Sequence, residues 1–216
     1  MILIGMFDSP FVRRVAISAT LLGMPFEHRN WSVGKDFDRI REFNPLGRVP
    51  ALVLDTGETL IESAMILDYL DDQAGSMRAL LPTSGIARRQ ALRYIALATG
   101  AADKGIHLVI ERVFRPVEKH HAPWSDRCRQ QVHGALTELD RLCVTTGDRE
   151  WLLGSAMTQA DVTVASYVTY LHDAMPLDLA PYPALCARVD NCEALPVFKQ
   201  FYLPFDAPEP HAVPTA

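Results

Sequence analysis

In the N-terminal third of the chain, the apolar positions change their spacing several times. Residues 1–6 form a continuous apolar run, and apolar side chains at helical spacing follow over residues 10–23. The pattern further predicts a strand at 26–33, a short helix at 36–43, strands at 50–55 and 58–61, and a helix at 62–74. The order is therefore βαβαββα, with the first two strands parallel and the last two paired as a hairpin.

The pattern changes after residue 76, because no strand signal of comparable strength follows. Helical spacing predicts helices at 86–119 (bent or ended near Pro116), 124–146, 158–174, 181–192 and 194–203. We therefore predict an α+β fold followed by an all-α part. The predicted division is an α/β domain at 1–76, a linker at 77–85, an all-helical domain at 86–203 and a disordered proline-rich tail at 204–216.

Composition narrows the class of partners. The chain has 216 residues, enough for two modest domains, and its net charge of −5 argues against a nucleic-acid binder. No uncharged apolar stretch approaches the roughly 20 residues that span a bilayer, and the apolar N-terminus is short and lacks a basic leader. We therefore expect a cytoplasmic protein with no membrane partner.

No metal is expected. The four cysteines, Cys128, Cys143, Cys186 and Cys192, match no usual zinc spacing, so reduced structural thiols are the simplest interpretation. The remaining candidates for a metal site are His120, His121 and His133. The first two are adjacent, and adjacent side chains on a helix point about 100° apart, which makes them poor chelates.

Ser9 and Pro10 mark the start of the first helix. Proline suits the first helical position and serine suits the cap before it, so a plain N-cap is one interpretation. The other is functional, because a helix N-terminus stabilises an anion and a hydroxyl there donates one more hydrogen bond to it. The residues alone leave both interpretations open.

Two further motifs lie in the same domain. In "NPLGRVPAL" (44–52), a cis Val49–Pro50 bond would leave the backbone of Val49 free to pair with an extended peptide, whereas a trans proline would merely start an edge strand. At the start of the last helix of this domain, Glu62 can meet an ammonium, and Ser63 can present its hydroxyl and N–H to a carboxylate. Either residue could instead be only a helix cap.

The order S-P-F, N-P-x-G-x-V-P-x-L and E-S-x-x-I-x-x-Y-L resembles the glutathione S-transferases. The resemblance covers roughly residues 1–203 and is to the bacterial, YibF-like type that has serine at the active position. It implies a thioredoxin-like N-terminal domain, an all-helical C-terminal domain and glutathione as co-substrate. It also implies that Ser9 stabilises the thiolate, and that the backbone of Val49 pairs with the cysteinyl part, with Pro50 as the cis-proline. The remaining roles that it implies fall to Glu62 and Ser63 for the γ-glutamyl group, Lys35 or else Arg48 for the glycyl carboxylate, and Phe11 as a wall beside the sulfur, unless Phe11 is an ordinary core residue.

The expected activity is attack of the glutathione thiolate on a small hydrophobic electrophile, as in detoxification, or glutathione-dependent peroxide reduction. The alternative is a glutathione-binding protein without turnover. The resemblance also suggests a homodimer that uses the helices at 62–74 and 86–119. The electrophile is expected between Phe11, the loop 31–36 and the helix around 95–110. Side-chain candidates in the helical domain are Thr99, Asp103, His107 and Tyr167.

One motif of the helical domain is interpreted as structural. Thr158, followed by Asp161 three residues later, resembles a capping box with aspartate in place of the usual glutamate or glutamine. We expect this pair to start a helix and to take no part in catalysis.

Overall fold

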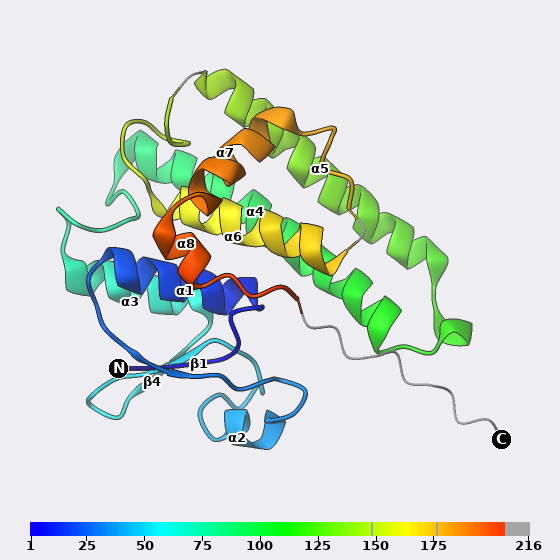
Figure 1. Ribbon diagram of the computed structural model, residues 1–216, viewed down its shortest axis with the longest axis horizontal. Helices are drawn as coiled ribbons and strands as arrows, with labels where there is room; N and C mark the ends of the chain where they lie inside the picture. The colour runs from blue at the N-terminus through cyan, green and yellow to red at the C-terminus, as the bar shows by residue number, and fades with distance from the viewer. Residues whose placement is uncertain (148, 176, 206–216) are drawn as a thin grey trace.

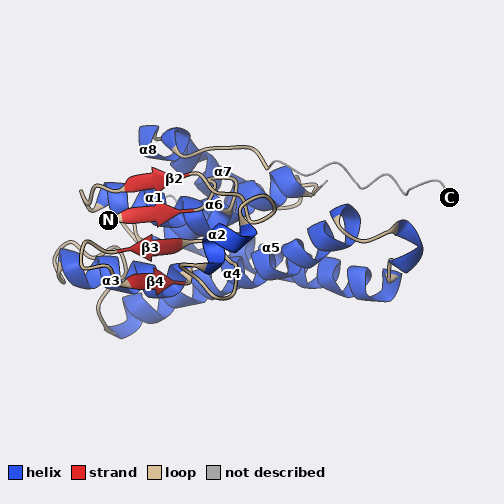
Figure 2. Ribbon diagram, turned by 90° about the horizontal axis from the view of Figure 1, so that it is seen from below, coloured by secondary structure: helices blue, strands red, loops and turns tan. Residues whose placement is uncertain are grey.

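The computed structural model describes residues 1–147, 149–175 and 177–205. Its sheet contains β1 (Ile2–Ile4), β2 (Glu27–Arg29), β3 (Ala51–Val53) and β4 (Thr59–Ile61) in the order β2-β1-β3-β4 (Figure 2). β1 is parallel to β2 and antiparallel to β3, and β3 pairs antiparallel with β4. The helices of this part are α1 (Pro10–Leu21), α2 (Phe37–Arg41) and α3 (Ser63–Ala74). The predicted βαβαββα order and strand directions are confirmed.

The two faces of the sheet are covered by different helices. Leu3 pairs with Leu52 across β1 and β3, and both belong to the large core with α1 and α3. Their chain neighbours Ile4 and Ala51 point to the other face, where they pack with Ile40 of α2. This alternation is the period of two that a strand imposes on its side chains. Figure 1 shows the result, with α1 and α3 between the sheet and the helices of the C-terminal part, and α2 on the other side of the sheet.

The second part of the chain contains helices and no strand among its described residues. It contains α4 (Gly85–Val113), the 3₁₀ turn η1 (Val117–Lys119), α5 (Ala122–Thr146), α6 (Gln159–Ala174), α7 (Pro183–Glu193) and α8 (Pro196–Gln200). The predicted break near Pro116 is confirmed, because α4 ends at Val113 and η1 follows the proline. The predicted boundaries at 76 and 86 stay a prediction. From residue 206 on, the predicted disordered tail lies outside the described residues.

The small side chains in "ALATGAADKG" serve close packing of α4 against α6. A Cβ at Gly105 would lie 2.3 Å from Leu171 Cδ2, so a larger residue would displace this buried side chain. Ala98, Ala101 and Ala102 of the same stretch are buried in the core. The stretch therefore fixes where α4 stands relative to the rest of the protein.

The capping box predicted at the start of α6 is confirmed. Thr158 Oγ1 accepts a hydrogen bond from the Ala160 N–H at 3.3 Å, and Asp161 Oδ2 accepts from the Thr158 N–H at 2.8 Å. Asp161 is buried, and its Oδ1 accepts a further bond from the Leu152 N–H. The carboxylate thus ties the preceding loop to the helix.

Candidate functional site

Ser9 occupies the N-cap position of α1, but its side chain makes no capping hydrogen bond. Pro10 fills the first helical position, where its missing N–H removes one of the unpaired donors of the helix start. The residue is half-buried. The N-cap interpretation therefore accounts for the position of Ser9 and leaves its hydroxyl uncommitted at the positive end of the helix.

The loop around Val49 packs tightly against the end of β1. Gly5 has a φ of +130°, and a Cβ there would lie 2.6 Å from Val12 Cγ2 and 2.7 Å from Val49 Cβ. A side chain at this position would therefore push the loop away from α1. The Val49–Pro50 bond is cis, the isomer that the functional interpretation requires.

A cavity of about 380 Å³ opens beside Ser9. Its walls come from both parts of the chain: Met6, Asp8, Ser9, Pro10, Phe11, Trp31, Ser32, Val33, Arg48 and Val49 from the N-terminal part, and Asp103, Ile106, His107, Tyr170 and Phe205 from the helical part. Burial raises the pKa of Tyr170 to about 12, with Asp8 adding to the shift and Arg112 opposing it, so its hydroxyl stays protonated at neutral pH. The cavity therefore combines an aromatic wall with a few polar groups.

Four of the predicted site residues, Ser9, Phe11, Arg48 and Val49, line this cavity. Pro50 is buried behind the loop, and Lys35 is exposed and does not line the cavity. Phe11 also packs on Tyr167, with ring centroids 5.1 Å apart, so it serves the core and the cavity together.

On the helical side, Asp103 and His107 line the cavity as expected, whereas Thr99 and Tyr167 do not. Tyr167 is completely buried, and Tyr170, one turn later on α6, takes the place at the wall. Sequence reasoning missed Tyr170. Helical spacing places Tyr170 on nearly the same face as Tyr167, but it does not indicate which of the two rings reaches the cavity.

Glu62 has an unusual backbone. It precedes α3 with φ +64° and ψ 126°, the one positive φ outside glycine among the described residues. Such a conformation costs roughly 1–3 kcal/mol and is found preferentially at functional sites. The Glu62 carboxylate lies 3.4 Å from Arg48 Nη1, and both side chains are about half exposed. A pair exposed to this extent contributes little stability, so both groups stay accessible to a ligand.

Ser63 lies at the first position of α3 and is 2% exposed. Its hydroxyl oxygen accepts hydrogen bonds from Nε and Nη2 of the buried Arg14, at 3.2 and 2.7 Å. Glu62 and Ser63 do not line the cavity beside Ser9, but the Arg48–Glu62 contact joins their helix end to it. The buried guanidinium of Arg14 thus contacts the side chain of Ser63, and the sequence pattern did not predict this contact.

The cysteines stand apart from this site. All four are free thiols, and none lines the cavity. Burial raises the pKa of each of them, that of Cys143 to about 12. A thiol with a raised pKa is a poor nucleophile at neutral pH. Within the described residues, no three or more His, Cys, Asp or Glu side chains gather in a way that would hold a metal ion.

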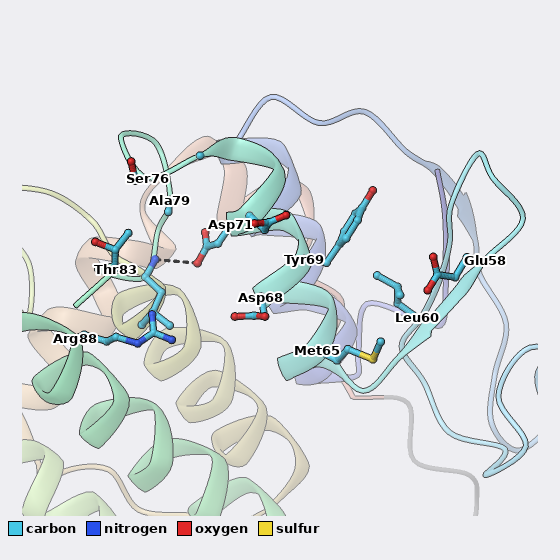
Figure 3. A pocket seen from close by; sticks show the side chains of 13 residues that line it. Glu58, Leu60, Met65, Asp68, Tyr69, Asp71, Ser76, Ala79, Thr83 and Arg88 are labelled. Atoms are coloured by element: carbon cyan, nitrogen blue, oxygen red, sulfur yellow. Dashed lines mark hydrogen bonds between the residues drawn. The ribbon is translucent and has the colours of Figure 1, made fainter. Parts of the chain in front are cut away.

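A second hollow, of about 720 Å³, lies over the outer face of α3 (Figure 3). Asp68, Tyr69 and Met65 of α3 line it, together with Arg88 of α4. Asp71 accepts bonds from the N–H groups of Leu80 and Leu81 and holds the connection to α4 against α3. None of the predicted site residues lines this hollow, so it is distinct from the cavity beside Ser9.

None of the helices described is long and apolar enough to cross a bilayer.

Comparison with known proteins agrees with this architecture. Residues 3–78 match the glutathione S-transferase N-terminal domain, and residues 122–187 match the glutathione S-transferase C-terminal domain. The chain is 30% identical over 170 residues to the uncharacterized GST-like protein YibF of Escherichia coli, covering 79% of this chain and 81% of the relative. The chain therefore belongs to the glutathione S-transferase family.

Other relatives differ in their named activity. The maleylacetoacetate isomerase of Pseudomonas aeruginosa is 28% identical over 196 residues, covering 87% of this chain and 88% of that protein. Among solved structures, a glutathione S-transferase from Methylobacterium radiotolerans in complex with glutathione sulfonate superimposes with a TM-score of 0.85 at 31% identity. That match covers 98% of this chain and 96% of the other. A glutathione transferase family member from Pseudomonas fluorescens with bound glutathione matches with a TM-score of 0.82 at 29% identity, covering 94% and 99%.

Proposed function

We propose that this protein is a glutathione transferase that ionises bound glutathione and directs its sulfur at a small hydrophobic electrophile. The observation that carries the proposal is the hydroxyl of Ser9, which stands at the N-terminus of α1, makes no capping bond and lines the cavity. A thiolate placed there meets the positive end of a helix and a hydrogen-bond donor together. Family membership and the relatives with bound glutathione support the same ligand.

The proposed roles divide among the three parts of the tripeptide, beginning with the cysteinyl and glycyl parts. Ser9 stabilises the thiolate, and Phe11 packs beside it. The backbone of Val49, fixed by Pro50, pairs with the cysteinyl part. Arg48 is the better supported partner for the glycyl carboxylate, because it lines the cavity and Lys35 does not.

The γ-glutamyl group is proposed to bind at the start of α3. Glu62 meets its ammonium and Ser63 its carboxylate. The positive φ of Glu62 and the open N–H groups of the helix end support this arrangement.

The energies needed for ionisation are within reach of these groups. A thiol with a pKa of about 8.5 is only ~3% thiolate at pH 7. Lowering that pKa by two units requires about 2.7 kcal/mol of differential stabilisation. A helix end supplies up to ~2 kcal/mol, and a hydrogen bond to a charged group adds about 1.5–3 kcal/mol. No general base is needed.

The cavity favours an uncharged, partly aromatic electrophile. Ile106, Tyr170 and Phe205 form its apolar wall, and Asp103 adds a negative charge. Several relatives are named maleylacetoacetate isomerases, whose substrate carries two carboxylates. Arg48 is the sole arginine or lysine among the described lining residues, and the proposal uses it for glutathione itself. We therefore favour conjugation, or peroxide reduction by the same thiolate, over isomerisation.

The test separates binding from turnover. Glutathione is titrated into the protein in a calorimeter, and conjugation is then assayed with a panel of neutral aromatic electrophiles and with hydroperoxides. Heat of binding together with turnover supports the enzyme. Heat without turnover on the whole panel supports a glutathione-binding protein with a regulatory role, and no heat at all rejects the proposal.

We further propose a cytoplasmic homodimer with a role in detoxification, assembled through α3 and α4. Large apolar side chains are exposed on both helices, including Met65 at 50% and Leu92 at 42%. Met65 also lines the hollow of Figure 3, which a second copy would cover. Sedimentation of the protein and of Met65→Glu tests this. A wild-type monomer at micromolar concentration contradicts it.

A further inference from the structure

Two consecutive arginines of α1 are buried to the same degree, 3% exposed each, and have different partners. Arg13 donates from Nη1 and Nη2 to the two carboxylate oxygens of Glu193, at 2.8 and 2.6 Å, and from Nη2 also to the carbonyl of Phe198. Burying a charge is costly unless a countercharge accompanies it. Arg13 has this countercharge in Glu193 of α7, and the two residues form a structural ion pair.

Arg14 has neutral partners instead. Besides its two bonds to Ser63 Oγ, it donates from Nη1 to Thr163 Oγ1 at 3.3 Å, and its guanidinium lies 5.1 Å from the ring centre of Tyr167. No carboxylate in the described part of the chain comes within ion-pair distance of it. Because α1 packs against both α3 and α6, Arg14 reaches both helices from one position.

The charge on this guanidinium is retained. Burial lowers the pKa of Arg14, while Tyr167 and the carboxylate of Glu62 oppose the shift, and an arginine does not lose its proton in a protein. The positive charge of Arg14 therefore lies against Ser63 at the start of α3, and no carboxylate of the described residues is in contact with it. A ligand anion at this helix end would supply the missing countercharge.

The geometry also fixes the direction of the Ser63 hydroxyl. A hydroxyl has two acceptor positions and one donor, and Arg14 occupies both acceptor positions. The proton of Ser63 is therefore available only for donation, and hydrogen bonds accepted from a cation strengthen it as a donor. Ser63 is set to receive an anion and not an ammonium.

We infer that Arg14 is the buried countercharge for the α-carboxylate of the γ-glutamyl group of glutathione, acting through Ser63 as a positioning residue. The inference rests on the proposed function. It adds a buried cation to the proposed γ-glutamyl subsite, on the carboxylate side at Ser63.

The experiment compares two ligands that differ by one group. Calorimetry measures the affinities of glutathione and of 4-aminobutyryl-cysteinyl-glycine, which is glutathione without the α-carboxylate. We expect the wild type to prefer glutathione by about tenfold or more, the ratio that a charge-assisted hydrogen bond supplies. Arg14→Met should lose this preference by weakening glutathione alone, and Arg14→Lys, which keeps the charge, should retain part of it.

Arg13→Met is the matched control, because it removes a neighbouring buried arginine that faces the other way. It should lower stability and leave the ratio of the two affinities unchanged. A wild-type ratio within about twofold overturns the inference without any variant, so the test holds even if Arg14→Met does not fold. Equal weakening of both ligands by Arg14→Met and Arg14→Lys also overturns it. If the wild type binds neither tripeptide, the proposed function fails first and the inference fails with it.

Discussion

Helices α1 and α6 both begin with a hydroxyl residue at the N-cap, and they use it in opposite ways. At α6, the hydroxyl of Thr158 and the carboxylate of Asp161 both accept hydrogen bonds from backbone N–H groups at the helix start. At α1, the hydroxyl of Ser9 makes no capping bond. The same residue class at the same position therefore closes one helix and leaves the other open to a ligand.

A third helix start shows that an uncommitted hydroxyl is not sufficient by itself. Ser84 precedes α4 and also makes no capping bond, but it is exposed and lines neither hollow described above. Water satisfies such a side chain. Ser9 differs because it is half-buried at the wall of a cavity. What marks a functional N-cap is a free hydroxyl together with a place for the ligand.

The largest expected effect lies at the closed helix start. Asp161→Asn leaves one acceptor oxygen where two carboxylate oxygens now receive bonds from Leu152 and Thr158. Because a buried N–H is left unsatisfied, we expect a loss of about 3 kcal/mol in the free energy of unfolding, measured with denaturant. Glutathione affinity of the folded protein should not change. A variant of full stability with weakened binding would reverse the assignment of the two helix starts.

The open helix start should respond in the opposite way. Ser9→Ala removes one hydrogen bond to the thiolate, about 1.5–3 kcal/mol, so the apparent pKa of bound glutathione should rise by about 1–2 units. The acid limb of the pH–rate profile of conjugation should move upward with it, while the free energy of unfolding stays within about 0.5 kcal/mol.

Ser9→Thr keeps the hydroxyl and serves as the matched variant for this measurement. Its profile should resemble that of the wild type. If Ser9→Ala leaves the pH–rate profile in place, the hydroxyl has no part in ionising the thiol. If Ser9→Ala unfolds the protein at mild denaturant concentration, Ser9 is a structural cap after all.

Much of the fold could be predicted from the sequence, because local patterns carry the information. Short apolar or alternating runs and helical spacing predicted every strand and helix of the N-terminal part, and proline and glycine set several of their ends within a few residues. The capping box at Thr158 was predicted for the same reason, since its partners are three residues apart. The break near Pro116 is likewise local.

The site was harder to predict where its contacts cross between distant elements. The spacing of the chain indicates that Ser9, Val49 and Glu62 belong to known motifs, but it does not indicate that Arg14 lies beneath Ser63, 49 residues later. Tyr170 was missed for a related reason. Both Tyr167 and Tyr170 lie on α6, and which of them faces the cavity depends on how that helix is rotated against α4, where Gly105 sets the contact.

Helix α3 extends the comparison to an acidic N-cap. Glu62 makes no capping bond, as Ser9 makes none, so its carboxylate is also open to a ligand. Glu62→Gln should weaken glutathione binding by roughly three- to tenfold, because a charged partner of the ammonium is replaced by a neutral one. Calorimetry with glutaryl-cysteinyl-glycine, which lacks the ammonium, should show no such loss. Equal losses for both ligands would place the role of Glu62 in the helix and not in the ligand.

The smallest expected effect concerns the two cations considered for the glycyl carboxylate. Arg48 lines the cavity and is about half exposed, whereas Lys35 is exposed and lies off the cavity wall. An exposed ion pair contributes about 0.2–1 kcal/mol, so Arg48→Ala should weaken glutathione binding by no more than about fivefold.

Lys35→Ala is the matched variant, and it should leave the affinity unchanged. The effect of Arg48→Ala depends on a solvent-exposed charge, so raising the salt concentration should shrink this loss of affinity, because ions screen such pairs. A larger loss in Lys35→Ala than in Arg48→Ala would mean that the loop after β2 closes over the ligand and brings Lys35 to the carboxylate. In that case, the residues that line the cavity would not identify the cation that binds the glycyl carboxylate. The comparison between the helix starts would still hold, because Ser9 lies at a helix start and Lys35 on a loop.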